Sequence, residues 1–400
     1  MTRILLRGGN VFDGTGTDPA PADVVMEGDR IVDVGLGLDG DVAVDVAGRT
    51  ILPGLFDCHV HVTFSHLDFM RMAQTPYSYR YYEAARNLEA TLRAGITSVR
   101  DAGGADLGIK QAVEDGLIRG PRMQISLSML SQTGGHGDEW MPNGARFAIM
   151  PVTPGIPDTI VDGADQMRLK VRELIRNGAD VLKVATSGGV LSPRDDPRHA
   201  HFRPAELEVL VEEAAAAGRF VMAHAQASDG IKNAVRAGIR SIEHGIFLDD
   251  EAIELMLARG TYLVPTLIAA RGVIDAAEAG LSIPEASVQK ARDVVEAHRD
   301  SFRRAVAAGV RVAMGTDSGV TPHGQNLREL ALMVEGGMTP AQALVASTAT
   351  AARLLAVEDD LGTVEPGKLA DIVIVEGDPY DIVELPATIS EVWKDGERVV

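Results

Sequence analysis

Cysteine is nearly absent from this sequence, in which the only one among 400 residues is Cys58. A single cysteine excludes an internal disulfide and a cluster of zinc-bound thiolates. The surrounding residues have the alternation of a strand, so the Cys58 side chain points away from the face that carries His59 and His61. We therefore expect Cys58 to be a small core residue.

Positive charge is also scarce. The chain has 38 lysines and arginines against 57 aspartates and glutamates, a formal net charge of −19. Nucleic acids and anionic membranes are bound by basic faces, so this composition argues against both partners. No apolar run approaches the roughly 18 residues of a membrane-spanning helix, and the N-terminal apolar run is too short for a signal peptide. These absences predict a soluble cytoplasmic enzyme.

The residues that are present predict one large α/β domain and one small β-domain. Hydrophobic residues make up 46% of the chain, which is enough for a sizeable core. Residues 1–52 and residues 359–400 both have the pattern of short strands with tight turns, so we expect the two chain ends to form one small β-sandwich. Residues 53–358 alternate apolar strands with helices, which predicts a (β/α)8 TIM-like barrel.

The eight barrel strands are predicted at residues 55–62, 98–102, 123–130, 181–185, 220–224, 241–244, 262–266 and 310–316. Helices are predicted between them, including 83–93, 165–176, 204–217 and 287–307. Pro204 follows polar residues, which is typical of a first helical position. The long connections 131–162 and 187–203 follow predicted strand ends, where barrel enzymes build their sites, so we expect them to be functional lids.

Two histidines stand out in the first of these strands. His59 and His61 are two positions apart, and side chains at that spacing lie on the same face of a strand. Both imidazoles can therefore reach one metal ion. The alternative is a pair of ordinary histidines on a half-solvated strand. The metal-site interpretation is favoured only if the rest of the chain supplies further ligands at strand ends.

Further chemically active residues lie at other predicted strand ends. They are Lys183, His224, His244 and Asp317. Each of these residues also has a structural interpretation when it is taken alone. Each histidine could be a polar residue with satisfied hydrogen bonds, Lys183 a buried ion-pair partner and Asp317 a helix N-cap. Because the C-terminal ends of barrel strands converge on one cavity, their conjunction predicts a shared site.

Longer motifs accompany these residues. They are Pro53-Gly54-Leu55-Phe56-Asp57-Cys58-His59-Val60-His61, Gly134-Gly135-His136, Ile242-Glu243-His244-Gly245, Gly315-Thr316-Asp317 and Gly362-Thr363-Val364-Glu365-Pro366-Gly367-Lys368-Leu369-Ala370-Asp371-Ile372. With them the sequence resembles the amidohydrolase superfamily over nearly its whole length. Within that superfamily it is similar to the group of Xaa-Pro dipeptidases and imidazolonepropionases.

The resemblance implies a site for two divalent metal ions, usually zinc. The implied ligands are His59, His61 and Asp317 for the more buried metal, His224 and His244 for the second, and Lys183 as a bridging carbamate formed with CO2. Chemistry gives an independent reason for the carbamate: an ammonium group repels cations, whereas a carbamate is anionic and offers two oxygens. Imidazole and carboxylate-type ligands suit zinc but also manganese, cobalt or iron.

A mechanism follows from this ligand set. Two cations lower the pKa of a bridging water, so that a metal-bridging hydroxide attacks the polarised carbonyl. Asp317 is expected to take the proton of that water and pass it to the leaving nitrogen. His136 is expected to donate to the developing oxyanion, because the glycines around it let its loop approach closely. The alternative is that His136 is an ordinary loop residue.

The substrate class stays open at this point. The leading prediction is a homo-oligomeric enzyme that cleaves the amide bond of a small molecule, a dipeptide or an N-acyl amino acid. The alternatives are a hydrolase of a cyclic amide, a carbamate or urea, or an organophosphate ester, and a metal-binding protein without catalysis, which would not need Asp317. Related dipeptidases tend to carry a substrate-binding tyrosine where this sequence has Gln226. Gln226 is predicted to bind substrate by donating a hydrogen bond, without the ring or the packing area of a tyrosine.

A basic cluster in this acidic protein is a candidate receiver for a substrate carboxylate. It consists of Arg194, Arg198, His199, His201 and Arg203, of which Arg203 is the predicted substrate-binding residue. The alternative is that these residues pair with Asp195, Asp196 or Glu206. His323 is also predicted to bind substrate, His66 and His298 to be structural or surface residues, and Glu243 to point away from the metal site by alternation.

Overall fold

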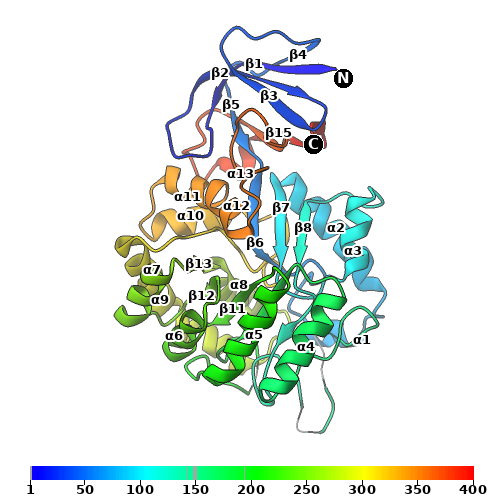
Figure 1. The fold of residues 1–400 in the computed structure, drawn as a ribbon, viewed down its shortest axis with the longest axis vertical. Coiled ribbons are helices and arrows are strands. Elements are labelled where there is room, and N and C mark those ends of the chain that lie inside the picture. The colour runs from blue at the N-terminus through cyan, green and yellow to red at the C-terminus, as the bar shows by residue number, and fades with distance from the viewer. Residues whose placement is uncertain (1, 142, 147–150, 193) are drawn as a thin grey trace.

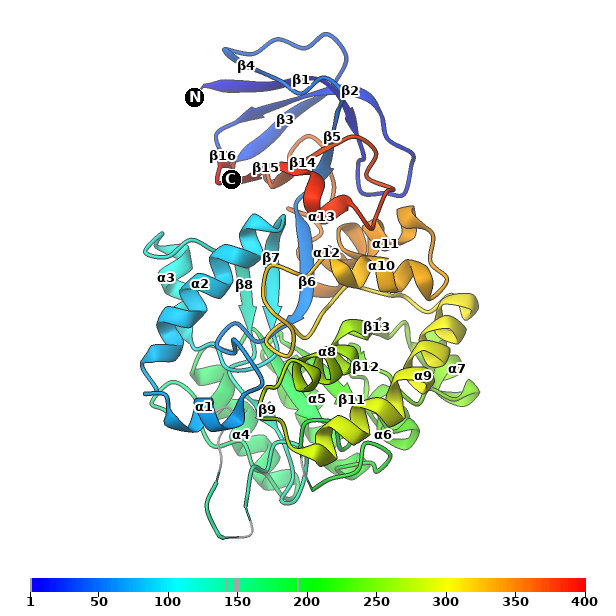
Figure 2. The same cartoon turned by 180° about the vertical axis from the view of Figure 1, so that it is seen from behind.

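The protein, seen in a computed structural model that describes residues 2–141, 143–146, 151–192 and 194–400, is an α/β body with a β-sheet at one end (Figure 1). Both chain termini lie in that sheet end, as the view from behind also shows (Figure 2). Residues 142 and 147–150 of the predicted lid 131–162, and residue 193 of the predicted lid 187–203, lie outside the described residues.

The sheet at that end is built from both ends of the chain. Its strands are β1 (Arg3–Val11), β2 (Ala20–Glu27), β3 (Arg30–Gly35), β4 (Val42–Asp45), β5 (Arg49–Pro53), β14 (Ile372–Glu376), β15 (Ile389–Lys394) and β16 (Glu397–Arg398). They follow the order β16-β15-β14-β5-β1-β2-β3, with β4 paired to β1, and β5 pairs antiparallel with β14. Hydrogen bonds thus join these strands in one sheet, and the predicted two-layer sandwich stays a prediction.

The body of the protein contains two parallel sheets. One has β6 (Leu55–Val60), β7 (Ile96–Asp101) and β8 (Arg122–Ile125), and the other has β9 (Met129–Leu130), β10 (Val181–Ala185), β11 (Phe220–Ala225), β12 (Ser241–His244) and β13 (Tyr262–Val264). Parallel strands with helical crossovers are consistent with a TIM-like barrel. Among the described residues, however, the strand ladders do not close into one ring.

The predicted strands 123–130 and 310–316 differ from the structure. The first is divided into β8 and β9, because Leu127 between them has a left-handed backbone (φ 66°) that an extended strand does not tolerate. The second contains only one isolated bridge, at Val312, and a further bridge follows it at Ser318. Its backbone still lies between the two sheets, since the carbonyl of Met314 accepts a hydrogen bond from Cys58 N (2.9 Å) and Leu263 N donates to the carbonyl of Arg311 (2.8 Å).

Helices cover the parallel sheets on their outer side (Figures 1 and 2). They are α1 (Phe69–Gln74), α2 (Tyr79–Arg93), α3 (Leu107–Glu114), α4 (Ala164–Arg176), α5 (Pro204–Ala216), α6 (Ser228–Ala237), α7 (Asp250–Arg259), α8 (Leu267–Glu278), α9 (Glu285–Ala308), α10 (Arg328–Glu335), α11 (Pro340–Ala346) and α12 (Ala349–Leu355). The short helix α13 (Leu385–Thr388) instead lies beside β14 in the terminal sheet. As predicted, α5 begins at Pro204. None of the described helices is long and apolar enough to cross a membrane.

Candidate active site

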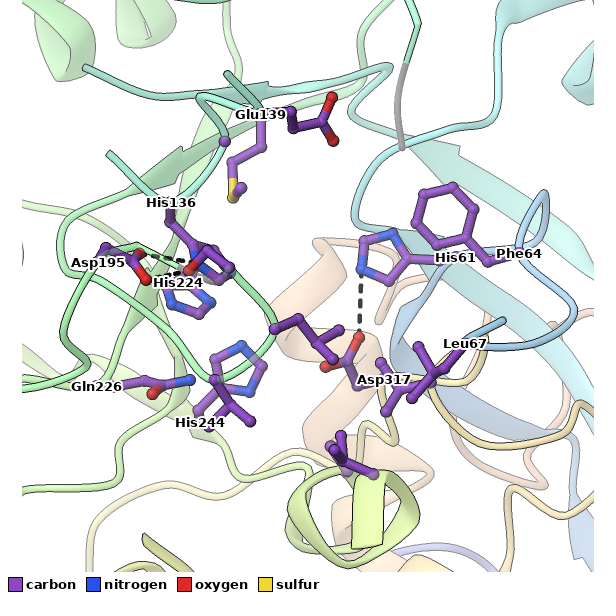
Figure 3. Close-up of a pocket in the computed structure, with 18 of the residues that line it drawn as sticks. His61, Phe64, Leu67, His136, Glu139, Asp195, His224, Gln226, His244 and Asp317 are labelled. Carbon is purple, nitrogen blue, oxygen red and sulfur yellow. Dashed lines mark hydrogen bonds and ion pairs between the residues drawn. The ribbon is translucent and has the colours of Figure 1, made fainter. Parts of the chain in front are cut away.

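A cavity of about 370 Å³ opens where the parallel strands end (Figure 3). All six residues predicted from strand ends line it, and we call this set the polar floor: His59, His61, Lys183, His224, His244 and Asp317. Two segments of the long connections line it from the other side, and we call them the loop rim: residues 134–141 and residues 190–192 with 194–195. The structure therefore brings the six floor residues together from five separate chain segments.

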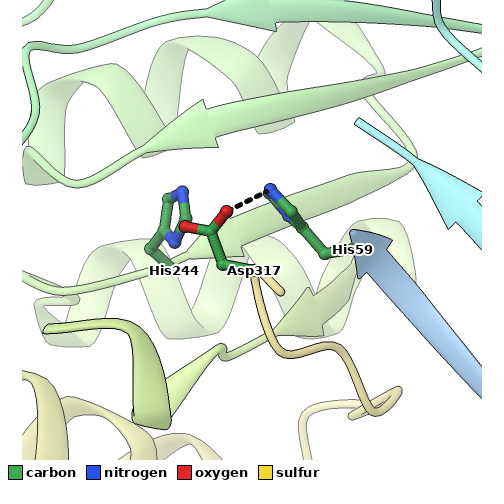
Figure 4. Close-up of side chains that lie close together, drawn as sticks. All are labelled: His59, His244 and Asp317. Carbon is green, nitrogen blue, oxygen red and sulfur yellow. Dashed lines mark ion pairs between the residues drawn. The ribbon is translucent and has the colours of Figure 1, made fainter. Parts of the chain in front are cut away.

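Asp317 lies at the centre of the floor. Its Oδ1 is 3.2 Å from His61 Nε2 and 3.5 Å from His59 Nε2. Burial alone would raise the pKa of this carboxyl, but the two neighbouring imidazoles hold its pKa well below the usual range, so it is ionised. His59, His244 and Asp317 each offer one atom in a group whose members lie within 4.8 Å of one another, close enough to share a metal ion (Figure 4).

Each floor histidine has one ring nitrogen engaged by the protein. His59 Nδ1 lies 2.8 Å from Glu243 Oε2, and His244 Nδ1 lies 2.7 Å from Thr266 Oγ1. The corresponding contacts of the other two are His61 Nδ1 to the Gly103 carbonyl (2.8 Å) and His224 Nε2 to the Gly188 carbonyl (3.1 Å). Metal-binding histidines in proteins are oriented in this way, with the second nitrogen left for the metal.

The protonation of three of the four floor histidines also suits metal binding; the exception is His61, where burial is outweighed by its contact with Asp317, which raises the His61 pKa. Burial lowers the pKa of His244 to about 3 and places the pKa values of His59 and His224 well below the ordinary value. These rings are therefore neutral near pH 7, and a neutral imidazole has the lone pair that a divalent cation needs.

Lys183 does not behave as a structural lysine. It is 2% exposed, and its Nζ has no hydrogen-bond partner among the described residues. Burial lowers its pKa to about 8, against the pull of the Glu243 and Asp317 carboxylates. An unpaired buried ammonium is costly, so the alternative of a buried ion pair fails here. The donor set fits divalent metals once the nitrogen of Lys183 carries an anionic group.

Three residues at the floor have left-handed backbones although none is glycine. They are His244 (φ 72°), Thr266 (φ 51°) and Asp317 (φ 61°). Such conformations cost about 1–3 kcal/mol each and persist where the surroundings enforce them, often at active sites. The Thr266 hydroxyl contacts the His244 ring, so two of the three strained residues support one another.

Sequence reasoning missed the role of Glu243. Alternation correctly excludes it from the cavity lining, but its carboxylate lies behind His59 and also accepts hydrogen bonds from Arg100 Nη2 (2.9 Å) and Ser241 Oγ (2.6 Å). Glu243 is fully buried between these partners. The sequence did contain a signal for this role, namely a glutamate within a buried strand. Such a residue needs a polar partner, and the residues adjacent to Glu243 in the sequence do not supply one.

His136 and Gln226, both predicted to act on the substrate, line the cavity. His136 Nδ1 is 2.8 Å from Ser192 Oγ and 3.1 Å from Asp195 Oδ2, and its ring stacks on the His224 ring with centroids 4.1 Å apart. Gln226 is 4% exposed, and its Oε1 has no partner among the described residues. Figure 3 shows its amide directed toward the cavity beside His244.

Other predicted substrate residues lie outside the cavity lining. Arg203 is exposed at the start of α5, where its backbone N donates to Glu206. The His323 ring is held by the carbonyl of Phe64, 2.9 Å from Nε2, and by that of His61. Of the basic cluster only Arg194 reaches the lining, with its guanidinium 5.3 Å from the centre of the Trp140 ring. His199 and His201 do not line the cavity, and Arg198 pairs with Asp196.

The remaining two histidines also lie near the site. His66 was predicted to be a structural or surface residue, and in the structure it lines the cavity. His298 lines the cavity too, but it is buried and its Nε2 lies 2.9 Å from the His244 carbonyl. The His298 ring therefore supports the left-handed turn at His244, a structural role.

Fold and site together are those of a metal-dependent hydrolase with its site at the ends of parallel strands. The chain belongs to the amidohydrolase family: the model of that family, described as "Amidohydrolase family", matches residues 50–399. It is thus a hydrolase that acts on carbon–nitrogen bonds, as the resemblance predicted.

Named relatives and solved structures are similar over most of the chain. An ochratoxinase from Aspergillus niger is 37% identical over 365 residues, covering 87% of this chain and 75% of the relative. A Xaa-Pro dipeptidase solved with methionine in its active site has a TM-score of 0.91 at 33% identity, covering 99% of both chains. A prolidase solved with N-methylphosphonate-L-proline has a TM-score of 0.89 at 36% identity, covering 100% of this chain and 99% of its own.

Proposed function

We propose that this amidohydrolase uses two divalent metal ions, most simply zinc, to cleave the amide bond of a dipeptide or an N-acyl amino acid. His59, His61 and Asp317 would hold one metal, His224 and His244 would hold the other, and Lys183, as a carbamate, would supply an anionic ligand to both. The observation that carries the proposal is the convergence of four histidines, an unpaired buried lysine and an ionised aspartate on one cavity.

The carbamate resolves the one misfit in the donor set. As an ammonium, Lys183 would bring positive charge toward two cations and leave three buried N–H donors unpaired. As a carbamate, the same side chain brings negative charge and one oxygen for each metal. Bound metals supply Lewis acidity at the substrate carbonyl and lower the pKa of water.

Two residues of the chain act on protons and charge. Asp317 is ionised and lies between His59 and His61, so it accepts the proton of the attacking water and returns it to the nitrogen of the broken bond. The His136 Nδ1 faces Ser192 and the Asp195 carboxylate, so it carries a hydrogen that it donates to them. In the doubly protonated ring, whose charge Asp195 balances, Nε2 also carries a hydrogen and donates it to the developing oxyanion.

The cavity favours a substrate with an apolar body and a carboxylate. Apolar lining residues include Phe64, Leu67, Met129, Val190, Ile246 and Val273. Arg194 is a lining cation that is exposed and able to clamp a carboxylate, and Gln226 offers a buried amide. Support comes from the amino-acid ligands of the two solved relatives, methionine and N-methylphosphonate-L-proline.

A substrate profile tests this proposal. Metal-reconstituted enzyme is assayed with a library of dipeptides and N-acyl amino acids, each as the free acid and as the C-terminal amide. We expect the free acid to have a kcat/KM at least about tenfold higher, since a charged hydrogen bond contributes ~1.5–3 kcal/mol. Equal rates on acid and amide, or activity confined to cyclic amides, carbamates, ureas or phosphate esters, would contradict the substrate class and leave the metal site standing.

A further inference from the structure

The His136 ring is fixed on several sides by groups that the proposed reaction does not use. One face of the ring stacks on His224 with planes 16° apart. The Nδ1 contacts Ser192 and Asp195, and Ser192 Oγ in turn donates to Asp195 Oδ1. The backbone of Gly189 approaches so closely that an added Cβ would lie 2.2 Å from His136 Cε1. This position therefore requires glycine for the ring to stay where it is.

The loop that supplies Gly189, Ser192 and Asp195 is tied to helix α9 by one side chain. Lys290 Nζ donates to the carbonyls of Gly189 (2.7 Å), Ser192 (2.5 Å) and Asp195 (2.8 Å). It also lies 3.2 Å from Asp195 Oδ1. The Lys290 side chain is 16% exposed and the Asp195 side chain is 3% exposed, so the pair is largely withdrawn from water.

Among the described residues, the polar contacts of Lys290 are all with residues that touch His136. The three carbonyls belong to the residues that contact the ring, and they are otherwise part of an irregular segment without a strand or helix to satisfy them. Asp195 also accepts a hydrogen bond from Gly189 N (3.0 Å), which closes the segment on itself. The ammonium thus balances the Asp195 carboxylate and fixes the backbone that carries it.

We propose that Lys290 is a positioning residue, which holds Asp195 and the backbone of Gly189 and Ser192 so that His136 presents Nε2 to the reacting carbonyl. The inference rests on the proposed function of His136 as an oxyanion donor. Lys290 does not line the cavity, so its effect on the reaction passes through His136. A donor acts on a transition state only where its geometry is held, and a shift of about 1 Å can cost about a hundredfold in rate.

A double-mutant cycle tests the link. Lys290→Met, His136→Ala and the double variant are compared in the metal-reconstituted enzyme by kcat, KM, metal content and melting temperature. We expect His136→Ala to lower kcat about a hundredfold, the usual effect of losing an oxyanion donor. Lys290→Met should lower kcat about tenfold with a smaller change in KM, and in the His136→Ala background it should add less than about twofold.

Lys232→Met is the matched control. Lys232 has a similarly buried side chain (13% exposed) and pairs with Asp249, but it does not line the cavity. Its variant should keep wild-type kcat. A spectroscopic readout separates positioning from general loosening: the ring ¹⁵N shifts of His136 should change in Lys290→Met and stay unchanged in Lys232→Met.

The outcomes separate the two proposals. Wild-type turnover of His136→Ala would overturn the oxyanion role, and the Lys290 inference with it. Two outcomes would overturn the Lys290 inference alone, provided that His136→Ala lowers kcat. In the first, Lys290→Met keeps the wild-type kcat. In the second, the double variant loses kcat by the full product of the two single effects. If Lys290→Met does not fold, Lys290→Gln decides by the same cycle, because its amide keeps donors for the loop carbonyls but not the charge.

Discussion

The polar floor and the loop rim line the same cavity but are built by different means. Floor side chains come from strands or their ends and are mostly buried: His59 is 1% and Lys183 is 2% exposed, and the side chains of His61 and Asp317 are 13% exposed. Rim side chains come from irregular segments and vary more, from 3% exposed at Asp195 to 38% at Met141 and 46% at Trp140. The difference predicts that the floor carries the metal chemistry and that the rim, apart from His136, selects which molecules undergo it, a division typical of barrel enzymes. Changes in the floor should therefore affect every substrate alike.

The largest effect is expected at Lys183. Lys183→Ala should lose most of the bound metal and nearly all activity on every substrate, because the bridging anion is removed. Metal content by elemental analysis and turnover by product assay measure this, and added short carboxylic acids should restore part of both. A Lys183→Ala protein with full metal content and near-normal turnover would show that this lysine is no ligand.

A smaller loss of metal but a large loss of rate is expected at Asp317. Asp317→Asn keeps the shape of the side chain and one oxygen but cannot carry a proton. Turnover should fall at least about a hundredfold, the lower range of general acid–base effects, while metal content falls less than in Lys183→Ala. Wild-type turnover of this variant across the pH range would exclude the proton-transfer role.

An intermediate effect is expected behind the floor, at Glu243. Its carboxylate orients His59 and balances Arg100, so Glu243→Gln should weaken metal affinity by about 10–100-fold. Titration with zinc in the presence of a competing chelator measures the change, and turnover at saturating metal should fall less than affinity. An unaltered affinity would mean that His59 keeps its orientation without this partner.

The smallest and most selective effect is expected at the rim. Arg194→Met should reduce the preference for a free acid over its amide about tenfold while leaving the rate on the amide nearly unchanged. Arg203→Met is the matched control from the same basic cluster, since Arg203 lies outside the cavity lining and should not alter the preference. A loss of rate on both substrates after Arg194→Met would break the division between floor and rim.

The floor could be predicted from the sequence because, in a strand, the spacing of two residues determines whether their side chains share a face. Two histidines two residues apart share a face whatever the rest of the chain does, and C-terminal ends of parallel strands meet at one edge. The same logic placed Lys183 and Asp317 in the shared site. It failed where the backbone is irregular: Leu127 interrupts one expected strand, and residues 310–316 form a single isolated bridge instead of a ladder.

The rim could not be predicted because its contacts depend on loop conformation. Arg194 and Arg203 have the same charge and lie in the same cluster, yet only Arg194 lines the cavity. Lys290 is one hundred and one residues from Gly189, whose carbonyl it binds, and nothing in the spacing indicates that contact. Tertiary contacts of this kind leave no repeating pattern in the sequence. Residue type and spacing therefore do not predict them.

The pairing of β5 with β14 also bears on how the protein is made. Thr50 donates a hydrogen bond to the carbonyl of Gly377, 327 residues later, and β5 leads directly into the strand that carries His59. At about 5–20 residues per second, the nascent chain waits roughly 15–65 s before β14 is synthesised. During that time the apolar strand with Ile51 and Leu52, both fully buried in the folded protein, presents an open edge. Chaperone dependence during synthesis should accordingly be concentrated in this strand.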